Sequence, residues 1–318
     1  MKTKISVIGG SGFLGSYVVQ KFLETNHQVK VSTRDKGQPE HYQHLLQMHE
    51  GDALEICEIN VLDMNSVAEF IKDSEVVVHC GTPFRFDISH EAAEELMYRP
   101  TLEGTKNIVS ACQESESVKK LIIISSVAAI NGFVPSFDPA KGREHIFTIK
   151  DEPVTHPEHP PYNQAKYRTD QWLRNFIQEH PALHFEIISL YPGLIIGKPM
   201  SELRDSTSAG MLYLLKNKLA PNPMMEMVYQ YDIDFAMVAV EDVAEAIYQS
   251  AILPNLHGKK YFISHETWCA SDIHAMLNGN NPEGAFRIQY NSQPAIDELG
   301  IHFSPAHLAL KKYSELMV

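Results

Sequence analysis

Apolar and polar residues follow two different periods along the N-terminal part of the chain. Short, largely apolar runs recur, and between them lie longer segments in which apolar residues return every three or four positions. The apolar runs predict strands near residues 4–8, 28–33, 54–61, 75–80, 119–125 and 184–191. The periodic segments predict helices near residues 12–26, 40–49, 63–72, 89–114 and 162–180. Strands that alternate with helices are typical of a doubly wound parallel sheet with helices on both faces, so we expect an α/β fold.

A cluster of glycines stands between the first predicted strand and the first predicted helix. Gly9, Gly12 and Gly15 are spaced three residues apart, and Phe13 and Leu14 lie among them at the start of the helix. Glycines permit a tight turn and let the backbone approach a pyrophosphate, and the free N–H groups of a helix N-terminus favour its negative charge. The sequence therefore predicts a Rossmann-type fold with a dinucleotide site at these five residues.

The pattern changes after about residue 192. Shorter elements and segments rich in Met and Pro, such as residues 221–225, replace the regular alternation. We expect a dinucleotide-binding domain over residues 1–192 and a smaller substrate-binding lobe over residues 193–318, some elements of which return to the first domain. Such a lobe would cover the carboxyl ends of the strands, where ligands bind in sheets of this kind.

Composition and charge narrow the choice of partners. The chain has 318 residues and a formal net charge of −13, which argues against nucleic acid and anionic membranes because both require a basic surface. We expect neither a membrane span nor a signal peptide, since no apolar stretch is long enough. The four cysteines are far apart in the sequence, so we expect reduced thiols in a cytoplasmic protein. We further expect a monomer or homodimer that acts on a small molecule.

Polar side chains with the chemistry of an active site occur in two places. Ser125 and Ser126 follow a buried strand, and Tyr162 and Lys166 lie one turn apart at the start of a predicted helix. A tyrosine can donate a proton to a carbonyl oxygen, a nearby ammonium lowers the pKa of its hydroxyl, and a serine can bind the same oxygen. We therefore predict that Ser126, Tyr162 and Lys166 are catalytic.

Two similar patterns are interpreted as structural. Tyr17 and Lys21 repeat the Tyr-x-x-x-Lys spacing, but on the first helix, where they form an ordinary pair on the helix surface. His41, His44 and His49 fall on one predicted helix, but no carboxylate or cysteine is spaced with them as a metal site requires. We therefore expect a solvated helix face and no metal.

The chain as a whole resembles the extended short-chain dehydrogenase/reductases of the NAD-dependent epimerase/dehydratase superfamily. It is most similar to the branch that contains dihydroflavonol reductase, cinnamoyl-CoA reductase and aldehyde reductase. Besides the glycine turn, the resemblance is carried by Ser32–Asp35, Gly81–Pro83, Pro100–Thr105, Ile124–Ser126, Tyr162–Lys166, Tyr191–Gly197, Val240–Ala244 and Leu299–Ile301. It implies the same catalytic role for Ser126, Tyr162 and Lys166. Thr101 stands where other members of the superfamily often have Asn, and it is assigned no catalytic role.

The resemblance also implies which residues hold the cofactor. Arg34, at the end of the second strand, implies a contact with the 2′-phosphate of NADP(H), with NAD(H) as the alternative. Asn60 and Val61 stand beside the adenine, where the branch usually has Asp-Leu. The remaining implied contacts are Gly81, Thr82, Pro83, Ser125, Tyr162, Lys166, Pro192 and Leu194.

Three functions are compatible with these features. The first is an NADPH-dependent reductase of a carbonyl compound, such as a dihydroflavonol, aldehyde or ketone. The second is a nucleotide-sugar epimerase or dehydratase with bound NAD, against which Arg34 speaks. The third is a non-catalytic dinucleotide sensor, which would not need both Tyr162 and Lys166. Residues 210–231, rich in Met, Leu and Tyr, form either the core of the C-terminal lobe or a pocket for an apolar carbonyl substrate.

Overall fold

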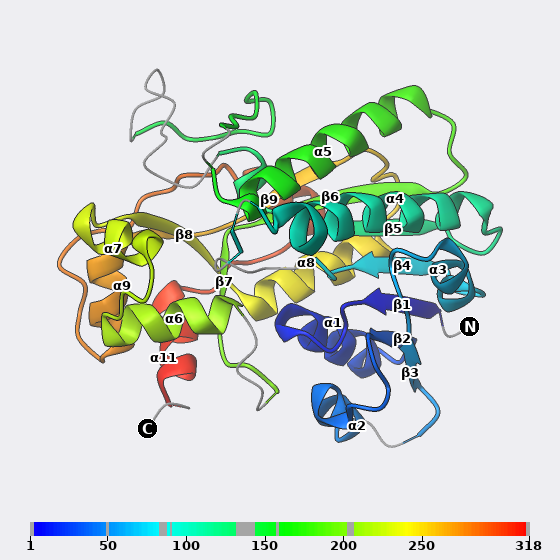
Figure 1. Cartoon of the computed structure of the whole chain (residues 1–318), viewed down its shortest axis with the longest axis horizontal. Helices are drawn as coiled ribbons and strands as arrows, with labels where there is room; N and C mark the ends of the chain where they lie inside the picture. The colour runs from blue at the N-terminus through cyan, green and yellow to red at the C-terminus, as the bar shows by residue number, and fades with distance from the viewer. Residues whose placement is uncertain are drawn as a thin grey trace.

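The computed structural model is built around a seven-stranded parallel sheet (Figure 1). The structure describes residues 3–48, 51–82, 88–89, 91–131, 144–156, 159–201 and 207–315. In spatial order the strands are β3 (Leu54–Glu58), β2 (Gln28–Thr33), β1 (Lys4–Ile8), β4 (Val76–His79), β5 (Lys120–Ile124), β6 (Glu186–Pro192) and β9 (Lys260–Ile263). The order runs in opposite directions on either side of the β1–β4 pair, and ligands of such sheets bind at that point.

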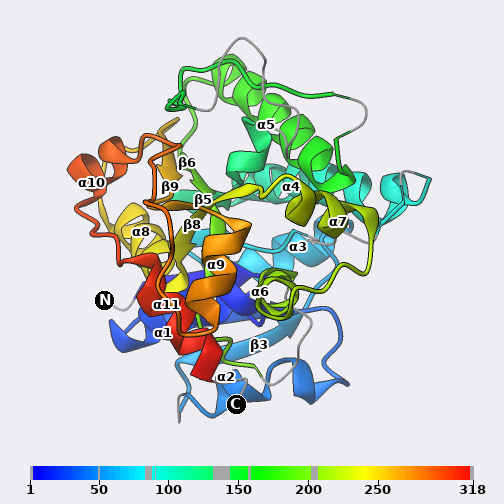
Figure 2. The same ribbon diagram turned by 90° about the vertical axis from the view of Figure 1, so that its left-hand side faces the viewer.

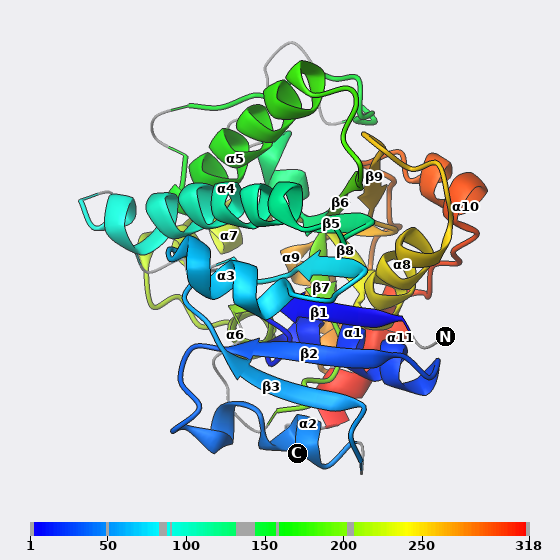
Figure 3. The same cartoon turned by 90° about the vertical axis from the view of Figure 1, so that its right-hand side faces the viewer.

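Helices cover both faces of this sheet, as the alternating pattern predicts. One face packs against α1 (Phe13–Glu24) and α8 (Val240–Ile252), and the other against α3 (Met64–Ile71), α4 (Arg99–Glu114) and α5 (Pro161–Glu179). Figure 3 shows α4 and α5 above the edge of the sheet that β1, β2 and β3 form. The predicted Rossmann-type doubly wound fold is thus confirmed.

The boundaries of the predicted elements differ most near residues 40–49 and 89–114. The first of these helices is only a short 3₁₀ turn (Pro39–His41) followed by α2 (Gln43–Leu46). The second begins as a π-helical turn (Glu94–Tyr98) that leads into α4. Pro39 begins the 3₁₀ turn, where the missing N–H of proline has no intrahelical partner to lose. Pro100 follows the π-helical turn within a continuous helical run, where its missing N–H removes one helical hydrogen bond.

A second, three-stranded sheet lies to one side of the first (Figures 1 and 2). Its strands are β10 (Thr267–Cys269), β8 (Asp234–Ala239) and β7 (Leu194–Ile196), in that order. The helices α6 (Thr207–Asn217), α7 (Pro223–Gln230), α9 (Ala270–Leu277) and α11 (Ala306–Ser314) pack around it, whereas α10 (Gln293–Leu299) packs near β9. Met211, Leu212, Leu215 and Met225 are buried in the core of this layer. These side chains therefore form the core of the lobe, and the pocket interpretation does not hold for them.

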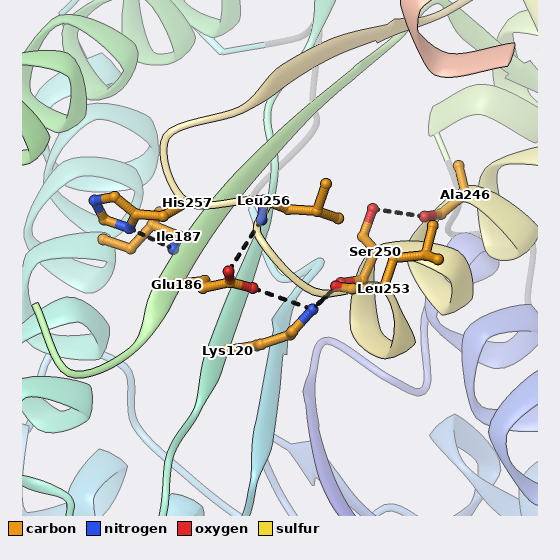
Figure 4. A network of polar contacts seen from close by, with 8 residues as sticks. All are labelled: Lys120, Glu186, Ile187, Ala246, Ser250, Leu253, Leu256 and His257. Atoms are coloured by element: carbon orange, nitrogen blue, oxygen red, sulfur yellow. Dashed lines mark hydrogen bonds and ion pairs between the residues drawn. The ribbon is translucent and has the colours of Figure 1, made fainter. Parts of the chain in front are cut away.

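Polar contacts join α8 to the amino ends of β5 and β6 (Figure 4). The ammonium of Lys120 lies 3.2 Å from Glu186 Oε2 and 3.0 Å from the carbonyl oxygen of Ser250, and it also donates to the carbonyl of Leu253. Glu186 Oε1 accepts from the backbone N–H of Leu256 at 3.0 Å. A cation thus binds the last carbonyls of α8, where the helix dipole favours it.

Candidate active site

The glycine turn after β1 can only be built from glycine at two of its three positions. Gly9 has a φ of +76°, and a Cβ atom there would lie 2.6 Å from the Cα of Gly81. A Cβ at Gly15 would lie 2.1 Å from the carbonyl oxygen of Gly9. At Gly12 the same distance is 3.4 Å, which is ordinary van der Waals contact. The close approach of Gly9 and Gly81 joins the ends of β1 and β4 at the point where the strand order reverses.

The first turn of α1 presents N–H groups at this place. Gly12 occupies the N-cap position, and no side chain there accepts a hydrogen bond from the helix. The backbone N–H groups of Phe13, Leu14 and Gly15 have no acceptor within an α-helix that begins at Phe13. The turn can therefore hold a pyrophosphate by backbone N–H groups and the helix dipole.

The loop after β2 separates Arg34 from the carboxylate that follows it. Asp35 accepts hydrogen bonds from the N–H of Gly37 at 2.7 Å and from the side chain of Gln38 at 2.8 Å, so its charge is directed into its own loop. Arg34 is exposed, and its side chain has no hydrogen bond or ion pair within the described ranges. Its guanidinium is therefore available for an anion beside the end of β2.

Asn60 and Val61 both follow β3 and both have structural contacts. Asn60 Oδ1 accepts from the N–H of Leu62 at 3.0 Å, which closes a local turn. The carbonyl of Val61 accepts from the side chain of Asn107 at 2.9 Å, and a Cβ at Gly104 would lie 3.1 Å from Val61 Cγ2. These contacts hold the segment against α4 at the same edge of the sheet.

Ser126 and Tyr162 meet between the end of β5 and the start of α5. Ser126 is buried, and its Oγ accepts from the backbone N–H of Ala128 at 3.1 Å. Pro161 begins α5, which places Tyr162 in the first turn of the helix. A hydrogen bond with the Ser126 side chain lowers the pKa of Tyr162, but burial raises it more, to about 12. The expected lowering is therefore wrong, because removal of the phenolate from water outweighs its neighbours, and the hydroxyl keeps its proton at neutral pH.

Lys166 connects three elements of the site. Its Nζ donates to the carbonyl oxygen of Ile124 at 2.9 Å and to Thr82 Oγ1 at 3.1 Å, and it lies 5.8 Å from the centre of the Tyr162 ring. Burial lowers the pKa of this ammonium to about 8. The three predicted catalytic side chains are thus brought together at the carboxyl ends of β4 and β5.

The other predicted cofactor contacts lie around this point or outside the described residues. Gly81 touches the glycine turn, Thr82 binds Lys166, and Pro83 lies outside the described residues. Ser125 donates its backbone N–H to the carbonyl of Leu190 at 2.8 Å. Pro192 ends β6 and Leu194 begins β7, and between them a Cβ at Gly193 would lie 2.4 Å from the carbonyl oxygen of Ala236.

The second Tyr-x-x-x-Lys pair has a structural environment. Tyr17 donates its hydroxyl to the carbonyl of Lys198 at 2.7 Å, and Lys21 forms an ion pair of 2.5 Å with Glu245 on α8. The pair joins α1 to neighbouring segments more than it faces solvent.

The histidine-bearing helix is also less exposed than expected. His44 is buried, with Nε2 2.8 Å from Ser16 Oγ on α1, because the short α2 packs against that helix. The solvated face predicted for it is therefore wrong at this residue, and His49 lies outside the described residues. No group of three or more His, Cys, Asp or Glu side chains in the described part of the chain could hold a metal. Cys57, Cys80, Cys112 and Cys269 are free thiols, as expected.

One buried histidine beside the predicted catalytic group was not predicted from the sequence. His79 ends β4, directly after three apolar residues, and its Nε2 lies 3.2 Å from Thr105 Oγ1 on α4. Asp170, on α5, accepts from Tyr191 and from Arg174 at 2.5 Å. A histidine that ends an otherwise apolar strand is a signal that could have identified His79.

A model of the NAD dependent epimerase/dehydratase family matches residues 5–263. The chain belongs to this family. It is 25% identical over 317 residues to the cinnamoyl-CoA reductase CAD2 of Medicago truncatula, covering 98% of this chain and 94% of the relative. It is 27% identical to an anthocyanidin reductase of Vitis vinifera, over 77% of this chain and 71% of the relative.

Solved structures agree with this assignment of the fold. The yeast methylglyoxal/isovaleraldehyde reductase Gre2, complexed with NADPH, superposes with a TM-score of 0.80 at 19% identity and covers 98% of this chain and 97% of its own. With its family and its reductase relatives, the chain is an NAD(P)-dependent reductase of the extended short-chain dehydrogenase/reductase type. None of the described helices is long and apolar enough to cross a membrane.

Proposed function

We propose that this protein is an NADPH-dependent reductase of an uncharged carbonyl compound, with Ser126, Tyr162 and Lys166 as its catalytic residues. The observation that supports this most is the meeting of these three side chains at the carboxyl ends of β4 and β5, next to the reversal of strand order, with Lys166 bonded to Ile124 and Thr82. Two of the similar proteins are named as reductases of cinnamoyl-CoA and of methylglyoxal or isovaleraldehyde, and all three compounds contain a carbonyl group.

The described residues fit a nicotinamide dinucleotide. The turn leaves no room for a Cβ at Gly9 or Gly15, so it is lined there by backbone atoms, which can approach the pyrophosphate. Arg34 is available for the 2′-phosphate, which supports NADPH over NADH. Thr82 and Lys166 lie where the nicotinamide ribose would bind, and a ribose hydroxyl could replace Thr82 as an acceptor for the ammonium.

The chain's own residues would bind, orient and protonate the substrate. When bound, the cofactor supplies a hydride to the carbonyl carbon. Ser126 would donate a hydrogen bond to the carbonyl oxygen and hold it beside Tyr162. Tyr162, which keeps its proton at neutral pH, would transfer that proton to the oxygen as negative charge develops. Lys166 would stabilise the resulting phenolate by its positive charge.

We further propose that the layer around β7, β8 and β10 closes over this site as the substrate-binding lobe. The layer follows β6 directly through Gly193 and extends over most of residues 193–318. The exceptions are β9, which is a strand of the main sheet, and α8, which packs against that sheet. The division of the chain near residue 192 is therefore proposed with these exceptions.

The test is NADPH oxidation with a panel of hydrophobic aldehydes, ketones and flavonoid-like carbonyls. Tyr162→Phe keeps the ring and removes the proton, so turnover should fall by about 10²-fold or more while NADPH still binds. Near-wild-type turnover in Tyr162→Phe would refute the role of this residue. UDP-sugars form the second arm, and their conversion without carbonyl reduction would favour an epimerase or dehydratase.

A further inference from the structure

A small polar cavity lies beside Lys166, among β4, β5, α4 and α5. It has about 10 Å³ open to the centre of a water molecule, which is roughly the room that one water needs. Six of the residues that line it are polar and buried: His79, Thr101, Thr105, Lys166, Thr169 and Asp170. A cavity of this size and polarity is suited to a bound water.

The hydrogen bonds of α4 determine the tautomer of His79. The hydroxyl of Thr105 has one proton, which it donates to the carbonyl of Thr101 at 2.7 Å. Thr105 Oγ1 must therefore accept from His79, so Nε2 carries the ring proton and Nδ1 is the acceptor. Nδ1 is buried and has no hydrogen-bond partner among the described residues. Burial, and then the nearby Lys166, lower the pKa of His79 to about 3, so the ring stays neutral.

Thr169 supplies a second unpartnered group at the same cavity. Its Oγ1 is buried and has no hydrogen-bond partner in the described part of the chain. Thr101 differs, because its hydroxyl donates to the carbonyl of Met97 at 2.6 Å within its own helix. Buried polar atoms in native proteins almost always have a partner, either in the protein or in ordered water. A water between His79 and Thr169 would satisfy both.

Lys166 can contribute a third bond to such a water. Two of its three N–H groups are directed at Ile124 and Thr82, and the side chain also lines the cavity. We propose that one water molecule is bound here between His79 and Thr169, and that His79 positions the Lys166 ammonium through this water. The inference rests on the function proposed above, in which Lys166 acts as a cation beside Tyr162.

The other charged and titratable groups around Lys166 are few. Directly after β4 the neighbour is Cys80, and burial raises the pKa of its thiol to about 12. On α5 they are Tyr162 and Asp170, and Asp170 already accepts from Tyr191 and Arg174. The residues of α4 and β5 that line the cavity carry no charge. The neutral acceptor of His79 is thus the group on β4 that can support the ammonium through a water.

The first experiment detects the water without any substrate. Long-range ¹H–¹⁵N spectra of protein labelled in histidine are recorded for the wild type, Thr169→Val and Thr101→Val, with His79→Gln to identify the His79 signals. We expect a protonated Nε2 and an Nδ1 that accepts a hydrogen bond in the wild type. Thr169→Val should move Nδ1 towards the position of a bare ring nitrogen, whereas Thr101→Val should leave it in place.

Two results of this experiment would overturn the proposal. One is a bare Nδ1 in the wild type, and the other is an equal shift in both threonine variants, which would indicate a change of packing. Because the spectra need no turnover, they test for the bound water even if the protein reduces no carbonyl compound. This proposal and the proposed function can therefore fail separately.

The second experiment follows the pH dependence of kcat and KM in NADPH-dependent reduction. In His79→Leu the Lys166 ammonium loses its water-mediated acceptor and its pKa falls. As pH rises, kcat should therefore begin to decrease at a lower pH than in the wild type. A pKa lowered by about one unit from the wild-type value of about 8 gives a deficit of roughly fivefold at pH 8, which approaches about tenfold at higher pH. We expect little deficit at pH 6 and an unchanged KM for the carbonyl substrate. His79→Gln, whose amide oxygen is also an acceptor, should restore most of the profile. An equal loss at every pH without rescue by Gln would show a merely structural role.

Discussion

The three glycines of the dinucleotide motif should respond differently to one added methyl group. In Gly15→Ala the new Cβ would lie 2.1 Å from the carbonyl oxygen of Gly9 and 2.6 Å from the Cα of Gly10. Both are backbone atoms, so neither can rotate away, and the turn must open. Overpacking costs about 1–3 kcal/mol and occasionally more, and we expect the upper part of that range because two backbone contacts are violated at once.

Gly12→Ala is the matched control for this clash. Its Cβ would lie 3.4 Å from the carbonyl oxygen of Gly9, and its φ of −76° suits any residue. We expect a cost of roughly 0.5–1 kcal/mol, from the poorer N-cap alone. The same Cβ would stand where the cofactor approaches the turn, so NADPH should bind more weakly although the protein remains stable.

Thermal unfolding and NADPH titration separate these two effects. For a chain of 318 residues, a loss of about 3 kcal/mol lowers the melting temperature of Gly15→Ala by roughly 4–5 °C, whereas Gly12→Ala should stay within about 2 °C of the wild type. Equal melting temperatures for the wild type and Gly15→Ala would refute the steric argument. Undiminished NADPH affinity in Gly12→Ala would refute the placement of the pyrophosphate.

Three further predictions concern charged side chains. Arg34→Ala should weaken NADPH binding by about 10- to 100-fold, as expected for charge-assisted hydrogen bonds worth roughly 1.5–3 kcal/mol, and leave NADH binding unchanged; equal affinities of the wild type for both cofactors would contradict it. Lys120→Met should lower the free energy of unfolding by about 3 kcal/mol, because it leaves Glu186 without its cation. In urea titrations the double variant with Glu186→Gln should recover part of this loss, whereas an unaltered midpoint for Lys120→Met would count against the network. Lys166→Met should abolish turnover. Burial lowers the pKa of Lys166 from 10.5 to about 8, so the folded wild type loses its buried charge between these pH values and becomes more stable as pH rises from 8 to 10.5. The stability of Lys166→Met relative to the wild type should therefore fall over that range, and a pH-independent difference would refute this assignment.

Local patterns in the sequence predicted the elements of the main sheet closely. The six predicted strands correspond to β1 to β6, because each is a short run with apolar residues bounded by turn residues. Most of these strands are buried on both faces, whereas β3 lies at the edge of the sheet and buries only Ile56. The prediction was least accurate for the helix expected near residues 40–49. The short α2 packs against α1 and buries His44, and a pattern of polar residues in the sequence cannot show this burial. The final strand β9 was missed, because Lys260–Ile263 is short and joins the sheet far from its neighbours in the sequence.

The sequence by itself determined the α/β class, the glycine turn and the residue types of the candidate site, because these depend on spacing within one or two elements. Only the tertiary structure decided how strongly each group is buried, since burial depends on elements distant in the chain. Tyr162 illustrates this: spacing from Lys166 predicts a lowered pKa, but the surrounding protein removes its hydroxyl from water and raises that pKa to about 12. The pairing of His79 with Thr105, and the cavity that both line beside Lys166, likewise arise only when β4, α4 and α5 pack together.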